Sequence, residues 1–160
     1  MTIDGTFNPG NSTVILNGEI QQVVSRVSGN RANISLYNLI VNNDNAIISN
    51  NTAITNQLTL NANVAIGRVI IPTETDSNGN LILLEPIFQA TTDTLSIAGV
   101  SPDAFVGNGK ITSGIVKRKI DQSEPGTYRF FDVHTTIHTT SANNLPSIIT
   151  MTKLQNVSSS

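Results

Sequence analysis

Asp132, His134 and His138 are the residues whose spacing gives the sharpest test of chemistry. On a helix, histidines at positions i and i+4 could bind one metal ion. We expect one long strand over 127–140, where four residues span about 13 Å, which is too far for the two histidines to share an ion. All three side chains would then lie on one solvated face. Because no Gly-x-Ser-x-Gly motif is present, a hydrolase triad is not predicted either.

Oxygen-bearing side chains recur in the segment Asp76–Asn80, whose sequence is DSNGN. Asp76, Asn78 and Asn80 form a weak candidate site for Ca²⁺, since carboxylate and amide oxygens are the ligands that this ion prefers. The plainer interpretation is a hairpin turn. We predict no cofactor, and beyond this candidate no metal.

The run Lys117, Arg118 and Lys119 is the basic cluster of the chain. In a strand, alternation places both lysines on one face and Arg118 on the other, beside Val116 and Ile120. Charges of this kind protect an exposed sheet edge from strand addition, which we favour over a polyanion site.

Composition narrows the class of protein. The 160 residues suffice for one domain or two small ones; 12% are charged, the net charge is −2 and cysteine is absent. A nucleic-acid partner is disfavoured because it requires a basic surface. Disulfides, thiolate zinc sites and cysteine nucleophiles are excluded. No apolar run is long enough for membrane insertion, and we expect no signal peptide in the first ten residues, so the chain is made without one or is a fragment of an exported protein.

Short runs of Val, Ile, Leu and Thr, bounded by Asn, Gly, Asp or Pro, predict an all-β protein. We expect parallel β-solenoid coils over residues 1–67. Residues 68–157 should form a mainly antiparallel, sandwich-like region packed on the coils, followed by a tail at 158–160. Val69–Ile71 and Leu81–Leu84 should pair across the turn, and a short helical turn is expected near Ser101.

The solenoid prediction depends on an internal echo. The segment Leu39–Asn42 resembles Leu58–Asn61 at an offset of nineteen residues, and Ile47–Ile48 resembles Val64–Ile66 at a similar lag. This is the size of one solenoid coil. Asn tolerates the left-handed conformation of tight corners, and stacked Asn side chains can bond one another as a ladder.

Several strings resemble the repeat units of large surface adhesin-like proteins of Bacteroidetes. In the first half these are Gly5 with Phe7, Ser12–Gly18, Gln22–Val24, Tyr37–Asn43 and Leu58–Leu60. In the second half they are Phe105–Gly109, Ile115–Ile120, Gly126–Phe130 and Pro146–Ile148, while Phe130–His134 departs from the pattern. The resemblance implies an exported, extracellular or cell-surface module.

The sequence therefore predicts a non-enzymatic structural or adhesive module of a surface protein or extracellular filament. Its open strand edges would associate with neighbouring copies or domains, and glycans or host surfaces are further candidate partners. The alternative is a carbohydrate-binding or phage tail-fibre domain. Such a domain stacks aromatic rings on sugars, and Tyr37 and Tyr128 are the candidate ligand contacts.

Overall fold

The computed structural model describes residues 2–3, 7–26, 33–49, 51–70, 73–84, 87–89, 93–140 and 145–153. The predicted all-β fold, with parallel coils and antiparallel strands, is confirmed. Its strands are β1 (Thr2–Ile3), β2 (Thr13–Leu16), β3 (Gln22–Arg26), β4 (Ile34–Val41), β5 (Ala46–Ile48), β6 (Thr52–Leu60), β7 (Val64–Ile66), β8 (Arg68–Ile70), β9 (Thr73–Thr75), β10 (Leu81–Leu83), β11 (Ile87–Gln89), β12 (Thr94–Ile97), β13 (Phe105–Val106), β14 (Gly114–Lys119), β15 (Thr127–Arg129), β16 (Thr136–His138) and β17 (Ile148–Lys153).

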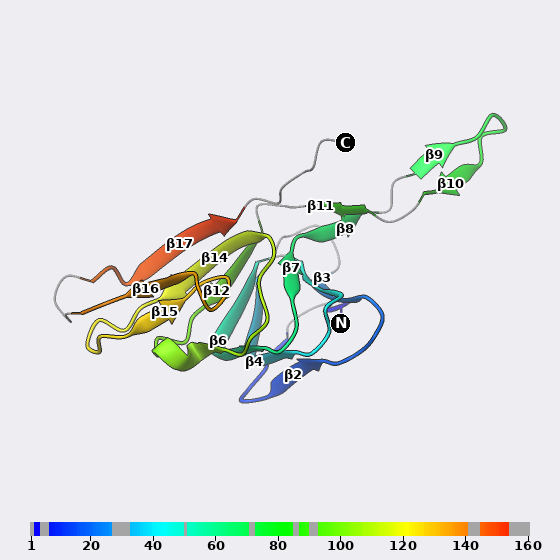
Figure 1. The fold of residues 1–160 in the computed structure, drawn as a ribbon. Helices are drawn as coiled ribbons and strands as arrows, with labels where there is room; N and C mark the ends of the chain where they lie inside the picture. Colours follow the sequence, from blue (N-terminus) through cyan, green and yellow to red (C-terminus); the bar gives the residue numbers. More distant parts are fainter. Residues whose placement is uncertain are drawn as a thin grey trace.

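Two sheets form the body of the molecule (Figure 1). The larger has the order β17-β14-β12-β6-β4-β2, with β13 also paired to β6, and the smaller has the order β1-β3-β5-β7. All these pairs are parallel except β14 with β17, which is antiparallel. The first three coils place one strand in each sheet: β2 with β3, β4 with β5, and β6 with β7.

The register confirms the echo in the sequence. Leu39 lies opposite Leu58 and Val41 opposite Leu60, at the predicted offset of nineteen residues. Alternate residues of each strand point inward and stack into apolar rows across the coils. One such row contains Leu36, Ile54 and Ile97, all fully buried. Each inward row therefore gains one aliphatic side chain with each coil.

A bulge in β6 interrupts this register. Leu36 lies opposite Ile54, but Asn38 lies opposite Gln57, so β6 contains one residue more than β4 at this point. With the extra residue, side chains on both sides of the bulge still point into the core. It also explains why the coil offset is eighteen residues before the bulge and nineteen after it.

Asn side chains bond between successive coils, as the sequence predicts. Asn61 Nδ2 donates to Asn42 Oδ1 at 2.8 Å, and Asn56 Nδ2 donates to Asn38 Oδ1 at 2.7 Å. Further along the corner, Asn63 Oδ1 accepts from the backbone N–H of Lys110 at 3.0 Å. Neutral amides thus bond between coils both within the strands and at the corners, where Asp44 also accepts from the N–H of Asn63 at 2.7 Å.

A pair of hairpins is inserted between the third and fourth coils. The prediction that Val69–Ile71 pairs with Leu81–Leu84 is wrong: β8 pairs with β11, and β9 pairs with β10 further out. After the insertion, β12 returns to pair in parallel with β6, and β14 pairs in parallel with β12. The boundary predicted at residue 67 therefore does not separate parallel from antiparallel pairing, since the coil stack continues beyond it.

The far end of the stack carries a cap. The prediction of one strand over 127–140 is wrong, because β15 and β16 form an antiparallel hairpin. Asp132 causes the reversal: its Oδ1 accepts from the backbone N–H groups of His134 and Thr135, both at 2.9 Å. Tyr128, Phe130 and Phe131 of this region are buried against the core. The short helical turn expected near Ser101 is confirmed as a 3₁₀ helix, η1 (Pro102–Ala104).

Candidate functional site

The first coil forms an open end of the stack. β2 is the last strand of the larger sheet. The apolar side chains around it are exposed: Ile15 is 53% exposed, Ile20 is 80% and Phe7 is 39%. An edge strand with exposed apolar side chains is a template for pairing with another chain.

The backbone of β2 is only half used. The carbonyl oxygens of Ser12 and Leu16 accept from the N–H groups of Asn38 and Asn42 on the β4 side. In a parallel pair, alternate residues bond to the same neighbour. The backbone groups of Thr13 and Ile15 therefore face away from β4, where no strand lies among the described residues.

The opposite end of the core is closed around two buried arginines. Arg118 occupies the inward row of Leu36, Ile54 and Ile97 and is fully buried. Its guanidinium donates to the carbonyl oxygens of Gly99 at 2.6 Å, of Ser101 at 2.5 Å and of Pro102 at 3.1 Å.

The charge of Arg118 is desolvated. Burial lowers its pKa to about 10, although the nearby Tyr128 opposes that shift. The guanidinium lies 5.3 Å from the centroid of the Tyr128 ring. Arg118 thus ties the η1 loop to the core through dipoles and a ring face.

Arg129 likewise ties the loop of Gly107 and Gly109 to the core. It donates to the carbonyl oxygens of Gly107 and Gly109 and lies 4.2 Å over the Phe105 ring. Gly107 has φ +95°, and a Cβ there would lie 2.1 Å from the Leu60 carbonyl oxygen, so the loop can approach β6 this closely only with glycine. Sequence reasoning placed Arg118 on the inward face by alternation but gave no indication of Arg129.

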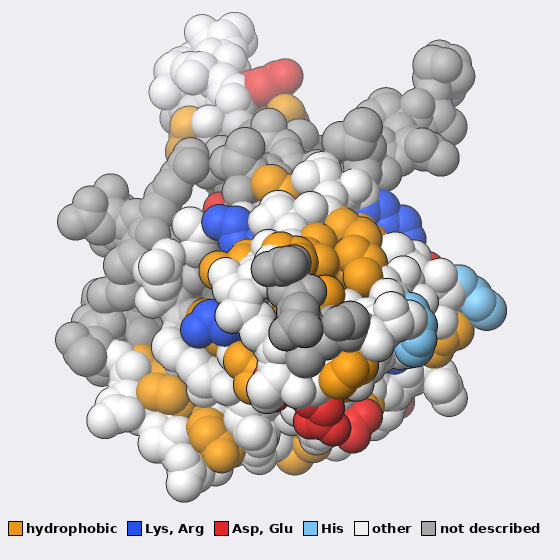
Figure 2. Space-filling model, turned by 90° about the vertical axis from the view of Figure 1, so that its left-hand side faces the viewer, with side chains coloured by type: hydrophobic (Ala, Val, Ile, Leu, Met, Phe, Trp, Pro, Cys, Tyr) orange, Lys and Arg blue, Asp and Glu red, His pale blue; other side chains and the backbone are white. Residues whose placement is uncertain are grey.

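β17 is the second open edge. On one side it bonds to β14, and on the other side no strand among the described residues pairs with it. Ile148 is 51% exposed, and the exposed Lys117 and Lys119 lie on the neighbouring strand opposite Thr150 and Ile148. Figure 2 views the molecule from the ends of β15, β16 and β17 and shows hydrophobic side chains at the centre, Lys and Arg on both sides of them, and Asp and Glu below. The prediction that the basic run Lys117–Lys119 protects an exposed sheet edge is wrong, because its strand, β14, is paired on both sides.

The proposed Ca²⁺ ligands lie in a tight turn at the tip of the β9–β10 hairpin. Asp76 Oδ1 accepts from the N–H groups of Asn78 at 2.9 Å and Asn80 at 2.8 Å, and Asp76 Oδ2 accepts from Asn80 Nδ2 at 3.0 Å. Hydrogen bonds from Asn80, first from its side chain, lower the pKa of Asp76 despite a small opposing effect of burial. The arrangement is that of a plain turn, and ion binding at it stays a hypothesis.

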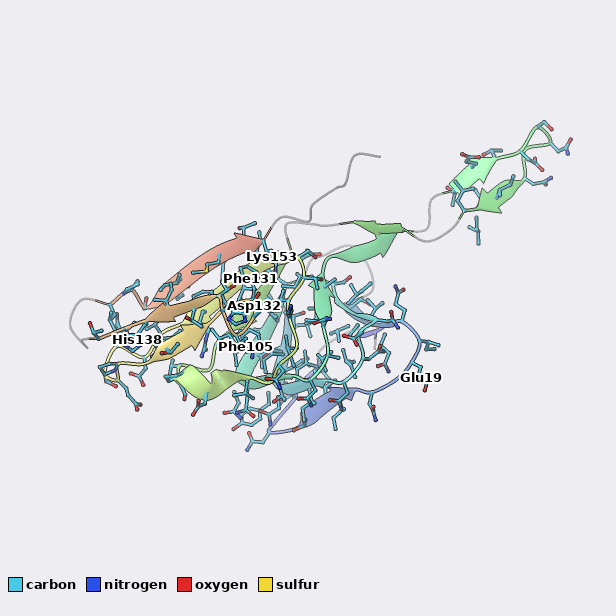
Figure 3. All side chains as sticks on the ribbon, in the orientation of Figure 1. Glu19, Phe105, Phe131, Asp132, His138 and Lys153 are labelled. Atoms are coloured by element: carbon cyan, nitrogen blue, oxygen red, sulfur yellow. The ribbon has the colours of Figure 1, made fainter. Side chains whose placement is uncertain are left out.

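The structure does not gather the other candidate residues into a site. His134 lies in the turn after Asp132, whereas His138 on β16 contacts Thr127 Oγ1 through Nδ1 at 2.9 Å, so the predicted common face does not exist. Asp132 instead pairs with Lys153 at 3.9 Å beside Phe131 (Figure 3). Among the described residues, no group of three His, Asp or Glu side chains is placed to hold a metal ion.

The two candidate ligand tyrosines differ in accessibility. Tyr37 is half-buried in β4, at the position where the register with β6 shifts. Tyr128 is fully buried, and its hydroxyl group accepts from the N–H of Asp121 at 3.1 Å and contacts the carbonyl oxygen of Glu124 at 3.3 Å. The role predicted for Tyr128 as a sugar platform is therefore at odds with its position in the core.

Comparison of the chain with models of protein families, with curated proteins and with solved structures finds no match. Within the described residues, no helix is long and apolar enough to cross a membrane. The two open edges and the inserted hairpins are the features of the geometry that bear on function.

Proposed function

We propose that this chain is a non-enzymatic structural module that assembles with copies of itself through its open strand edges. Its setting would be an exported surface protein or extracellular filament, as the resemblance of its repeat strings to surface adhesins suggests. The coil stack supplies a stiff body, since backbone ladders and apolar rows run continuously from β2 to β14.

The observation that carries this proposal is the exposure of apolar side chains at both edges of the larger sheet. Ile15 on the β2 edge and Ile148 on the β17 edge are each about half exposed, at 53% and 51%. Solenoid proteins that remain monomeric cover their ends with polar capping repeats. The aromatic cap of this chain covers the core at one end but leaves the β17 edge free.

Sedimentation velocity over a dilution series tests the proposal. The wild-type chain should form species heavier than its 17.1 kDa monomer, and their share should fall on dilution. The double variant Ile15→Lys/Ile148→Lys should sediment closer to the monomer, because a charge on each edge disfavours strand addition.

Val100→Lys is the matched control, since Val100 is 46% exposed but lies on neither edge. It should assemble as the wild type does. Circular dichroism should show the same strand content for all variants, because substitutions at exposed positions change the free energy of unfolding by less than about 0.5 kcal/mol. A wild-type chain that stays monomeric at every concentration contradicts the proposal.

A further inference from the structure

The β9–β10 hairpin with Leu84 forms a projecting arm, residues 73–84. Four successive aliphatic side chains on it are exposed: Leu81 by 68%, Ile82 by 44%, Leu83 by 67% and Leu84 by 36%. Figures 1 and 3 show the arm extending away from both sheets, and no other strand or helix of the described residues lies beside it. A run of exposed apolar side chains is typical of an interaction surface.

The turn at its tip fixes the shape of the arm. The bonds to Asp76 and the positive φ of Gly79, +83°, close the reversal between Thr75 and Leu81. An isolated two-stranded hairpin is only marginally stable, and a third strand with an apolar face stabilises it. The shape of the arm is therefore preformed, and pairing with another sheet would stabilise it.

The β17 edge offers such a sheet. One row of its backbone N–H and C=O groups has no strand partner in the described part of the chain. Ile148 on this strand is exposed and lies opposite Lys119 in the ladder with β14. An added strand would bond to the free row and cover Ile148.

Charge favours this edge over the β2 edge. The arm contains Glu74 and Asp76 and no basic residue, whereas the exposed Lys117 and Lys119 lie on β14 beside this edge. Of the other basic residues on β14 and β17, Arg118 is fully buried and Lys153 pairs with Asp132. Around β2, residues 7–25 contain Glu19 as their one charged residue, which has the same sign as the arm.

The arm does not lie on the β17 edge of its own chain. In Figure 1 it points outward beyond β8 and β11, away from β17. In this arrangement the complementary edge is one that another copy supplies. An arm and an edge at different places on one molecule make a heterologous contact, which extends into a row of copies unless it closes into a ring.

We propose that the arm of one copy adds to the free edge of β17 in a second copy. The apolar run Leu81–Leu84 then covers Ile148, and the acidic arm joins the sheet that carries Lys117 and Lys119. This inference rests on the proposed self-assembly and names the element and the edge that produce it.

Disulfide trapping tests the contact directly, because the chain contains no cysteine. Leu83→Cys, carrying an affinity tag, is mixed with untagged Ile148→Cys under mild oxidation. A disulfide-linked dimer of tagged and untagged chains should form. The matched mixture of Leu83→Cys with Ile15→Cys should give at least tenfold less, since Ile15 is equally exposed but lies on the other edge.

Leu81→Ser/Leu83→Ser supplies an independent readout by sedimentation. Both side chains are exposed, so the variant should fold as the wild type does and lose its heavier species. If the wild type assembles and this variant assembles equally, or if trapping favours Ile15→Cys, the arm inference is overturned and the proposed function stands. A wild type that never assembles overturns both.

Discussion

Arg118 shows how a charged side chain can occupy an apolar row. Its stem continues the stack of Leu36, Ile54 and Ile97, and its guanidinium reaches the loop that carries η1. Carbonyl dipoles, rather than a carboxylate, accept from its two terminal nitrogens, while its buried Nε has no hydrogen-bond partner. Burial without a counter-ion is costly, and the lowered pKa reports that cost.

Replacing Arg118 should therefore loosen the capped end. Arg118→Leu removes the bonds to Gly99, Ser101 and Pro102 and should lower the free energy of unfolding by about 2 kcal/mol or more. Arg118→Lys should lose less, because an ammonium keeps the charge but cannot span the same carbonyls. Urea denaturation measures both.

Lys117→Leu is the control for Arg118, since it changes a neighbouring basic residue on the solvated face. It should change the free energy of unfolding by less than about 0.5 kcal/mol. Equal stability of Arg118→Leu and the wild type would mean that the buried guanidinium gives no net stabilisation.

At the scale of elements, one corner bond between adjacent coils joins two neutral side chains. Asn42 and Asn61 bond to each other from adjacent coils. Neighbouring strands are about 4.8 Å apart, so charges at these positions would repel. The choice of Asn at the corners is thus part of what keeps the coils in register.

Converting this pair to carboxylates tests the ladder. Asn42→Asp keeps an acceptor for Asn61 and should have little effect, whereas Asn61→Asp loses the donor and should cost about 1 kcal/mol. The double variant should lose about 1 kcal/mol more than the sum at neutral pH and low salt.

High salt should reduce that extra loss, and so should acid, because protonation of one aspartate restores a donor. Urea denaturation at two salt concentrations and two pH values measures it. Strict additivity of the two substitutions under all conditions would contradict contact between the corners.

The repeating elements could be predicted from sequence because each coil reuses one pattern. The matching of Leu39 with Leu58 was visible as an echo, and the inward placement of Arg118 followed from alternation. The residues of the Asp76–Asn80 segment predict its turn, and a short helical turn is expected near Ser101.

The remaining elements depend on which strands meet, and sequence pattern alone does not fix that. The apolar run Leu81–Leu84 resembles a buried strand, yet it is exposed in the arm. The Thr127–Thr140 stretch alternates like one strand, but the bonds accepted by Asp132 reverse it. Sequence pattern mispredicts this segment because an Asp-centred turn competes with extended backbone.

At the scale of the whole molecule, the two ends of the coil stack differ. The first coil exposes the parallel strand β2, and the last parallel strand, β14, is followed by the antiparallel β17 and the aromatic cap. The arm adds a third, acidic and apolar surface. A molecule with such unlike surfaces is suited to heterologous contacts, which build rows rather than closed pairs.

Electron microscopy of the concentrated wild-type chain tests this account most directly. We predict linear rows of copies that shorten on dilution and are missing from Leu81→Ser/Leu83→Ser. Isolated 17.1 kDa particles at every concentration would contradict the account.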